Sequence, residues 1–212
     1  MRTQRAYRQV LLLAIAVMLP ILPSPARAWE VSEIPALDEF IIQVANGEAG
    51  ELRGIYAPEL FAYSVVSQPE GSPAFVSAQP ETLTQFSAAS RYNTTGLLAH
   101  NYLAGESFSS LDDGQWIYLI YGDGRTETFI VRETVRFRAL DPNSVTSDFV
   151  DLESGARLSS TRLFFKVFNR PGSVTLQTCI YADGNLSWGR LFILAEPIED
   201  DVISMPHRMK FH

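Results

Sequence analysis

Residues 115–132 read QWIYLIYGDGRTETFIVR and combine two strand signals around one turn. Residues 115–121 are almost all aromatic or aliphatic, and such side chains favour strands. Residues 126–132 alternate between polar and apolar side chains, as a strand with one buried face does. Gly122-Asp123-Gly124 stands between them and is typical of a tight turn. The stretch therefore predicts a β-hairpin.

The same pattern continues on both sides of this hairpin. We expect further strands at residues 53–67 (interrupted at Pro58), 94–102, 135–140, 163–168, 174–181 and 190–195. Turn signals separate the later ones, at Asp141-Pro142-Asn143, Arg170-Pro171-Gly172 and Asp183-Gly184-Asn185. Residues 68–79 predict a loop or a strand pair with a turn, and residues 107–113 a connection.

Helix signals are few. Leu37, Phe40, Ile41 and Val44 have the spacing of one helix face, which predicts a short amphipathic helix over residues 37–45. Residues 81–89 are a second helix candidate. Many short strands, frequent turns and few helices predict a mainly β fold, a closed or nearly closed barrel of about eight strands with one or two short helices.

The first 28 residues have the layout of a secretory signal peptide. Arg2, Arg5 and Arg8 form a basic start, and Ala26-Arg27-Ala28 is typical of a cleavage site. The apolar run between them, residues 10–22, has 13 residues, fewer than the ~20 that a bilayer-spanning helix needs. We expect residues 29–212 to form one exported domain, secreted or at the cell surface, with a polar tail from about residue 197. If the segment is not cleaved, residues 10–22 would instead anchor the chain to the membrane.

Charge excludes some partners. Without residues 1–28 the chain has 13 basic and 24 acidic residues, a net charge of −11. Such a charge disfavours binding to nucleic acid or to anionic lipid through bulk attraction. We therefore expect no nucleic-acid partner.

Cys179 is the single cysteine of the chain. A lone thiol in an exported protein is either buried or used in chemistry, and the count alone leaves both open. In the expected strand over residues 174–181, VTLQTCIY, alternation places Val174, Leu176 and Ile180 on the face without the cysteine. Because the apolar side chains lie on that other face, the pattern favours a used thiol.

Two residues are candidate partners of this thiol. A hairpin through Asp183-Gly184-Asn185 would bring Arg190 beside the end of the cysteine strand, where a guanidinium can stabilise a developing oxyanion. His100 is the one histidine outside the C-terminal tail, and an imidazole near a thiol favours thiolate and protonates a leaving amine. Taken singly, a surface arginine and a packed or exposed histidine are the commoner interpretations.

The residues around Cys179 resemble a known family. Thr175-Leu176-Gln177-Thr178-Cys179 matches the Thr-Leu-x-Thr-Cys signature of sortases, which are exported cysteine transpeptidases. As in that family, an arginine follows in the next strand, at Arg190, and a histidine precedes the cysteine by 79 residues, at His100. Residues 108–131 also look like the segment after the sortase histidine. The resemblance covers roughly residues 94–197 and implies a sortase-like closed β-barrel.

The resemblance implies a reaction. Cys179 would attack a peptide bond of a sorting signal on a surface protein and form a thioacyl-enzyme, and His100 would protonate the leaving amine. His100 would then take a proton from the incoming amine of an acceptor in the cell wall or on a protein. Arg190 would stabilise the oxyanion, and Thr178 would be a supporting position. This chemistry implies no metal or organic cofactor.

Two other classes stay open. One is another cell-wall cysteine transpeptidase or peptidase. However, an L,D-transpeptidase carries Ser-His-Gly before its cysteine, and a papain-like enzyme carries its histidine after it, where this chain has only His207 and His212. The other is an inactive or divergent exported protein of this fold that binds a surface partner. The position of His100 and Arg190 relative to Cys179 separates an enzyme from a binding protein.

Overall fold

A computed structural model describes residues 34–144 and 146–198 of this chain. The expected signal peptide and nearly all of the expected tail lie outside the described residues. The strands are β1 (Leu52–Ala57), β2 (Phe61–Ser67), β3 (Thr82–Gln85), β4 (Thr95–Leu98), β5 (Trp116–Tyr121), β6 (Thr126–Ala139), β7 (Phe149–Asp151), β8 (Arg157–Leu158), β9 (Val174–Ala182) and β10 (Asn185–Pro197). The helices are α1 (Leu37–Val44), α2 (Ser87–Ser90) and α3 (Ser160–Phe168), with a 3-10 helix η1 (Ala104–Ser110). None of the helices in this part of the chain is long and apolar enough to cross a membrane.

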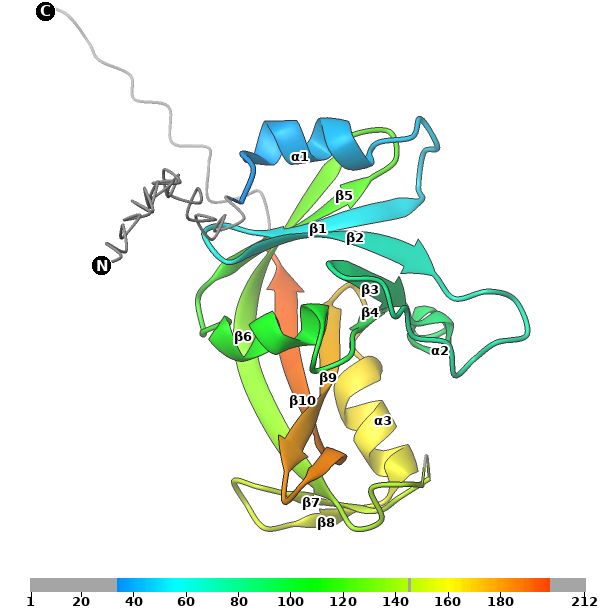
Figure 1. Cartoon of the computed structure of the whole chain (residues 1–212), viewed down its shortest axis with the longest axis vertical. Coiled ribbons are helices and arrows are strands. Elements are labelled where there is room, and N and C mark those ends of the chain that lie inside the picture. Colours follow the sequence, from blue (N-terminus) through cyan, green and yellow to red (C-terminus); the bar gives the residue numbers. More distant parts are fainter. Residues whose placement is uncertain (1–33, 145, 199–212) are drawn as a thin grey trace, which may run out of the picture. The chain divides into compact units, whose positions relative to one another are not determined.

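The strands form a closed barrel (Figure 1). Their order is β10-β9-β4-β3-β2-β1-β5-β6, and β6 pairs with β10 to close the ring of eight. The pairs β2–β3 and β4–β9 are parallel, and the other pairs are antiparallel. Strands β7 and β8 continue from β6 outside the ring. The expected closed barrel of about eight strands is therefore confirmed.

The barrel interior is the main hydrophobic core. Its members come from all eight strands and from η1, and they include Ile55, Phe61, Val65, Leu83, Leu97, Phe108, Ile117, Leu119, Val131, Leu176 and Ile193. Residues next to these along each strand point outward, since side chains alternate in a strand. Two helices cover parts of this outer face and bury the apolar residues that lie there.

Helix α1 covers β1 and β5. Its Phe40 and Val44 are buried against Tyr56 and Ile120 on the outer face of the barrel. A Cβ at Gly54 of β1 would lie 3.0 Å from the Phe40 ring and 3.1 Å from Val44 Cγ2, so the close approach of the helix requires a glycine there. The helix expected over residues 37–45 is confirmed to within one residue.

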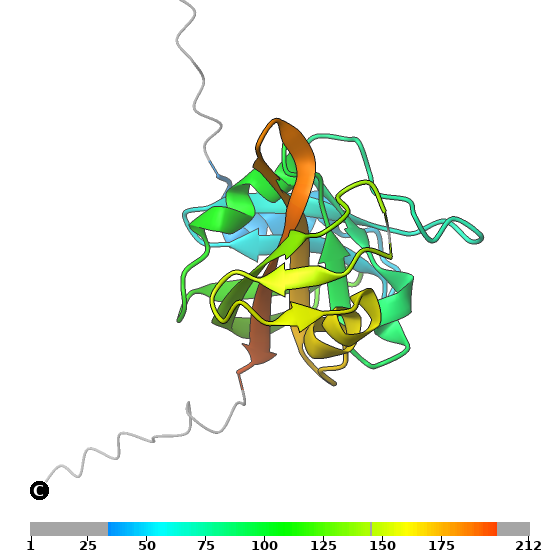
Figure 2. The same ribbon diagram turned by 90° about the horizontal axis from the view of Figure 1, so that it is seen from below.

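Helix α3 covers β9 and β10 beside β7 and β8 (Figure 2). The strand expected at residues 163–168 is therefore wrong. Its buried side chains, Leu163, Val167 and Phe168, follow helical spacing rather than alternation. Ser159 caps the helix, since its hydroxyl accepts a hydrogen bond from Arg162 N at 3.3 Å. A short apolar run does not by itself distinguish a buried strand from one face of a helix.

Other differences from expectation are local. The helix expected over residues 81–89 is a strand in its first half, β3, and only Ser87–Ser90 is helical. Pairing of β3 between β2 and β4 decides this, and its threonines favour a strand. Residues 53–67 form the β1–β2 hairpin, the strand expected at 94–102 ends at Leu98, and η1 occupies part of the expected connection at 107–113. The two strands expected at 126–132 and 135–140 are one strand, β6.

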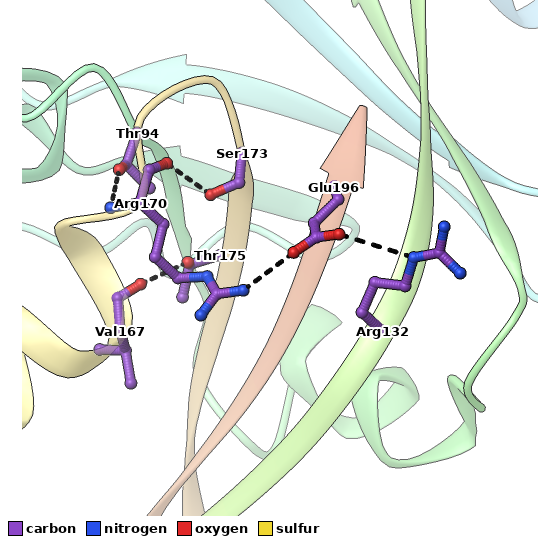
Figure 3. A network of polar contacts seen from close by, with 7 residues as sticks. All are labelled: Thr94, Arg132, Val167, Arg170, Ser173, Thr175 and Glu196. Carbon is purple, nitrogen blue, oxygen red and sulfur yellow. Dashed lines mark hydrogen bonds and ion pairs between the residues drawn. The ribbon is translucent and has the colours of Figure 1, made fainter. Parts of the chain in front are cut away.

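An ion-pair network joins strands at the end of the barrel where β4 and β9 begin (Figure 3). Glu196 of β10 accepts a hydrogen bond from Arg170 Nη2 at 3.2 Å and lies 3.7 Å from Arg132 Nε. Arg132 is the extra residue of a bulge in β6, since Leu194 pairs with Glu133 and Ala195 with Val131. Thr94 and Ser173 bind the backbone of Arg170 at 3.0 and 2.6 Å. We call this network the staple.

Candidate functional site

Cys179 lies on the outer face of β9, near the strand end. Val174 and Leu176 of the same strand are buried in the barrel interior, so alternation places Thr175, Gln177 and Cys179 outside. The expectation that the cysteine lies on the opposite face from the apolar set is confirmed. Cys179 is half-buried and forms no disulfide. The residue is therefore partly exposed on the outer face.

Arg190 is the direct partner of Cys179 in the β9–β10 ladder. Directly opposite residues of an antiparallel pair point to the same face, with Cβ atoms ~5 Å apart. Asp183 and Gly184 connect the strands with φ of 52° and 75°, which fits the mirror-image turns of two-residue hairpins. The hairpin expected through this segment is confirmed, and it brings Arg190 beside the thiol.

The Arg190 side chain is held by backbone carbonyls. Its Nη1 donates hydrogen bonds to Ser187 O at 3.0 Å and to Gly189 O at 2.8 Å. The guanidinium carbon lies 5.9 Å from the centre of the Phe149 ring in β7. Within the described residues, Nε and Nη2 have no hydrogen-bond partner. These two nitrogens form the parallel donor edge that a guanidinium offers to an oxyanion.

His100 follows the end of β4, the other neighbour of β9. The parallel ladder pairs Leu98 with Gln177, and Ala99 N continues it with a bond to Gln177 O at 3.1 Å. Leu98 is buried outside the barrel and Ala99 inside it, as alternation along a strand requires. If this register continued two residues beyond the Leu98–Gln177 pair, His100 would be level with Cys179, but β4 itself ends at Leu98. The structure therefore brings the segment that contains His100 beside β9.

A tight turn holds the backbone of His100. Its carbonyl accepts hydrogen bonds from Leu103 N and Gly105 N, both at 3.0 Å. Its ring stacks on Tyr102 with centroids 5.2 Å apart and planes at 20°. No hydrogen bond within the described residues joins the side chains of His100, Cys179 and Arg190 to one another. Cys179 and Arg190 are cross-strand partners, and the three side chains are held separately.

Thr178 faces the barrel interior and is 3% exposed. Its hydroxyl donates to Ala99 O at 2.9 Å, which ties β9 to the residue before His100. A Cβ at Gly105 would collide with Thr178 Oγ1 and lie 2.8 Å from His100 O, so η1 packs here only because residue 105 has no side chain. Thr178 thus lies behind the candidate nucleophile, in contact with the backbone of the histidine segment.

A cavity of about 140 Å³ opens on the same outer face. Gln177, Arg190 and Phe192 of β9 and β10 line one side of it. Its other lining residues come from α3, from β7 and from the residue before α2: Phe86, Phe149, Ser160, Leu163, Phe164, Val167 and Phe168. We call this cavity the aromatic slot. Gln177 lies two residues before Cys179, so this lining begins ~7 Å from the thiol along the strand. Sequence reasoning missed it because residues 163–168 were assigned to a strand.

Asp151 links β7 and α3, two elements that line the aromatic slot. Its Oδ1 accepts hydrogen bonds from Glu153 N at 3.0 Å and Ser154 N at 3.1 Å, and Oδ2 lies 3.6 Å from Lys166 Nζ of α3. The backbone hydrogen bond from Ser154 lowers the pKa of Asp151 most. The backbone hydrogen bond from Glu153 and the positive charge of Lys166 add to this effect, so the pKa lies below its usual range. The charged carboxylate thus links β7 to α3.

Metal-binding geometry is absent from the described part of the chain, where no three His, Cys, Asp or Glu side chains lie close enough to hold an ion. The side chains of the candidate site have chemistry of their own. A thiol can act as a nucleophile, an imidazole can carry a proton, and a guanidinium provides a fixed positive charge.

Comparison with known proteins gives likeness in structure only. No protein-family model matches the chain, and no curated protein matches it in sequence. Solved structures that it resembles include sortase C-1 from Actinomyces oris (13% identity, 81% of this chain and 85% of that chain, TM-score 0.47). Others are sortase C1 from Streptococcus suis (13%, 77% and 78%, TM-score 0.48) and Listeria monocytogenes sortase A (13%, 70% and 88%, TM-score 0.43).

Proposed function

We propose that this chain is an exported, sortase-like cysteine transpeptidase that acts on a sorting-signal peptide. The observation that carries the proposal is the direct pairing of Arg190 with Cys179. The parallel pairing of β4 with β9, which ends two residues before His100, supports placing the imidazole near the thiol. A thiol, an imidazole and a guanidinium are groups that can carry out acyl transfer through a thioester.

The reaction begins with the proton of the Cys179 thiol on His100, and the Sγ thiolate attacks the carbonyl carbon of the peptide bond. The oxygen takes the negative charge, and the Nε–Nη2 edge of Arg190 donates hydrogen bonds to it. The C–N bond then breaks, His100 gives a proton to the leaving amine, and a thioacyl-enzyme remains. The acceptor amine loses its proton to His100 and attacks the thioester, and the new amide leaves as Sγ departs.

The aromatic slot supplies a place for the acyl-donor peptide. An extended peptide advances ~3.3 Å per residue, so a residue two positions from the scissile carbonyl reaches Gln177 on one side of the slot. The walls are mostly phenylalanine, leucine and valine, which stabilise an apolar side chain by removing it from water. An apolar residue at that distance from the cleaved bond is therefore part of the proposed substrate.

A catalytically inactive binding protein is the competing proposal. It is favoured by one observation, the lack of a hydrogen bond between His100 and Cys179 in the described structure. Catalytic hydrogen bonds in proteins without substrate are often long and tighten when substrate binds. Arg190, which is paired directly with Cys179 and keeps Nε and Nη2 without a hydrogen-bond partner among the described residues, supports the enzyme instead.

A covalent probe decides between the two. The reduced, folded chain is incubated with a Leu-Pro-x-Thr-like peptide whose scissile amide is replaced by a thiol-reactive group, and the adduct is mapped by mass spectrometry. We expect one adduct, on Cys179, formed at least tenfold faster than with a scrambled peptide of the same composition, because binding orients the electrophile. Cys179→Ala is the control for attachment elsewhere. Equal labelling by both peptides, or none, would rule out the transpeptidase.

A further inference from the structure

The hairpin that carries Cys179 and Arg190 contains a large bulge. Ala182 pairs with Asn185 and Ile180 with Gly189, so three residues of β10, 186–188, stand opposite the single residue Tyr181. Such insertions re-aim side chains and disrupt the ladder locally. In this hairpin the bulge turns backbone carbonyls away from the ladder and toward side chains.

Side chains on either side fix the bulge. Asn185 Oδ1 accepts a hydrogen bond from Ser187 N at 2.7 Å. Trp188 Nε1 donates to Asp183 Oδ2 at 3.0 Å across the turn. The bulge is therefore held from within the hairpin itself, independently of the two residues that bind its carbonyls.

Three carbonyls of this segment bind the flanks of the candidate site. Leu186 O accepts a hydrogen bond from Asn101 Nδ2 at 3.0 Å, and Asn101 directly follows His100. Ser187 O and Gly189 O accept the two hydrogen bonds of Arg190 Nη1. One short piece of β10 thus contacts both the histidine segment and the arginine.

We propose that the β10 bulge, residues 185–189, positions His100 and Arg190 on the two sides of Cys179, and that Asn101 is the positioning residue on the histidine side. The inference rests on the proposed function, because the positioned groups are its catalytic residues. Asn101 touches no reacting atom. Its hydrogen bond links the segment after β4 to the β9–β10 hairpin. In the described structure the backbone pairing of β4 with β9 ends at Ala99, so no ladder hydrogen bond joins the two segments beyond that residue.

The arrangement has a clear chemical consequence. The bulge carbonyls occupy Nη1, so the guanidinium cannot turn its Nε–Nη2 edge away without losing two hydrogen bonds. Donors that are already oriented toward the developing charge stabilise a transition state more than mobile ones, since no reorganisation is needed. A misplacement of about 1 Å in such a group costs on the order of 10²-fold in rate.

Asn101→Ala and Asn101→Asp test the histidine side, since neither side chain donates to Leu186 O. Rates are measured for adduct formation with the Leu-Pro-x-Thr-like probe and for alkylation of Cys179 by neutral iodoacetamide between pH 5 and 9. We expect both variants to form the adduct about tenfold more slowly at saturating probe, with half-saturation within twofold of the parent. Their alkylation profiles should move toward that of His100→Ala. Asn46→Ala, which removes a similar exposed amide hydrogen bond near α1, should change neither.

A charged reagent tests the arginine side. Iodoacetate carries a negative charge that iodoacetamide lacks, so the ratio of their alkylation rates reports the positive charge near Cys179. A unit charge ~6 Å away favours the anion by roughly three- to tenfold. We expect Arg190→Ala to lose this preference and Asn101→Ala to lose part of it. The double variant should lose no more than Arg190→Ala alone, because both act through one bulge.

The outcomes separate the two proposals. If Arg190→Ala and His100→Ala change the alkylation behaviour and Asn101→Ala behaves as the parent in every measurement, the positioning role is wrong and the proposed function stands. If neither Arg190→Ala nor His100→Ala changes adduct formation or alkylation, the proposed function itself fails. Slower adduct formation with an unchanged melting temperature, in both Asn101 variants, supports the inference.

Discussion

The two ends of the β4–β9–β10 strands hold their polar side chains in different ways. At the end where β4 and β9 begin, the staple joins charged side chains to one another, Arg170 and Arg132 through Glu196. At the other end Arg190 binds backbone carbonyls, and His100 is held by its own carbonyl and by stacking on Tyr102. The same three strands thus carry a network of paired charges at one end, although Arg170 Nε is buried there without a hydrogen-bond partner among the described residues. At the other end the polar side chains do not pair with one another.

This difference separates structural polar groups from reactive ones. A charged side chain that is paired with another has little left to offer a substrate, because its donors and its charge are already used. A side chain fixed by main-chain carbonyls keeps its charge and its remaining donors. We therefore expect changes at the Cys179 end to alter reactivity with little loss of stability, and changes at the staple to alter stability alone.

The largest effect comes from a matched pair of arginine substitutions. Arg190→Lys keeps the positive charge but loses the planar guanidinium, whose separate nitrogens bind the bulge carbonyls and the oxyanion at the same time. We expect the rate of adduct formation on Cys179 to fall about 10²–10³-fold, as when an oxyanion donor is removed, with stability within about 0.5 kcal/mol of the parent. Arg170→Lys at the staple should leave that rate within twofold. Kinetics by mass spectrometry and urea unfolding measure both quantities.

The contrast between the two ends would be wrong if both substitutions had the same effects on the rate of adduct formation and on stability. Loss of rate in Arg170→Lys would mean that the staple transmits its state to Cys179 along β9. Loss of stability in Arg190→Lys, without loss of rate, would make Arg190 a structural residue of the hairpin.

Gly105→Ala tests how tightly the histidine segment is packed against β9. The new Cβ would collide with Thr178 Oγ1 and lie 2.8 Å from His100 O, and both atoms are held by hydrogen bonds. We expect a loss of about 1–3 kcal/mol in the free energy of unfolding, as for other overpacked sites, together with slower adduct formation. Glu106→Ala, at an exposed position on the same 3-10 helix, should be near neutral. An unchanged urea midpoint for Gly105→Ala would mean that η1 moves freely over Thr178.

Asp151→Asn tests the wall of the aromatic slot through its pH dependence. The pKa of Asp151 is lowered in the folded chain, so its charge stabilises the fold above the unfolded pKa of ~3.9 and this contribution disappears as pH falls below it. We expect the variant to be less stable than the parent by about 1 kcal/mol at pH 7. That difference should shrink below about pH 4. Unfolding at pH 7, 5 and 3 measures it, and a difference that stays constant with pH would show that the charge plays no part.

The local parts of this molecule follow from sequence patterns and the distant contacts do not. Asp183-Gly184 between two strand-forming runs predicts the hairpin, and the hairpin alone brings Arg190 beside Cys179. The segment that contains His100 is brought beside β9 by parallel pairing of β4 with β9, strands about 80 residues apart, and no turn signal encodes such a pairing.

Helix α3 and the β10 bulge do not follow from the sequence, for a related reason. The run LFFKVF fits either a strand or one helix face, and tertiary packing against Phe192 and Phe137 decides between them. The contacts of Asn101 and Arg190 with the bulge are hydrogen bonds to carbonyls, and a carbonyl is present at every residue. Side-chain identity therefore carries no signal for the acceptor, and only the three-dimensional structure brings donor and acceptor together.

Glu196→Gln has the smallest expected effect and tests the staple directly. All three side chains of the pair network are about a third to a half exposed, and exposed ion pairs contribute ~0.2–1 kcal/mol each. Loss of the shared carboxylate charge leaves Arg170 and Arg132 without the attraction that offsets their repulsion, so we expect about 0.5–1 kcal/mol of destabilisation in low salt. Because screening weakens these interactions, the difference should fall by more than half in 1 M NaCl. Adduct formation on Cys179 should stay unchanged throughout, and a change in that rate would mean that the two ends of β9 are coupled.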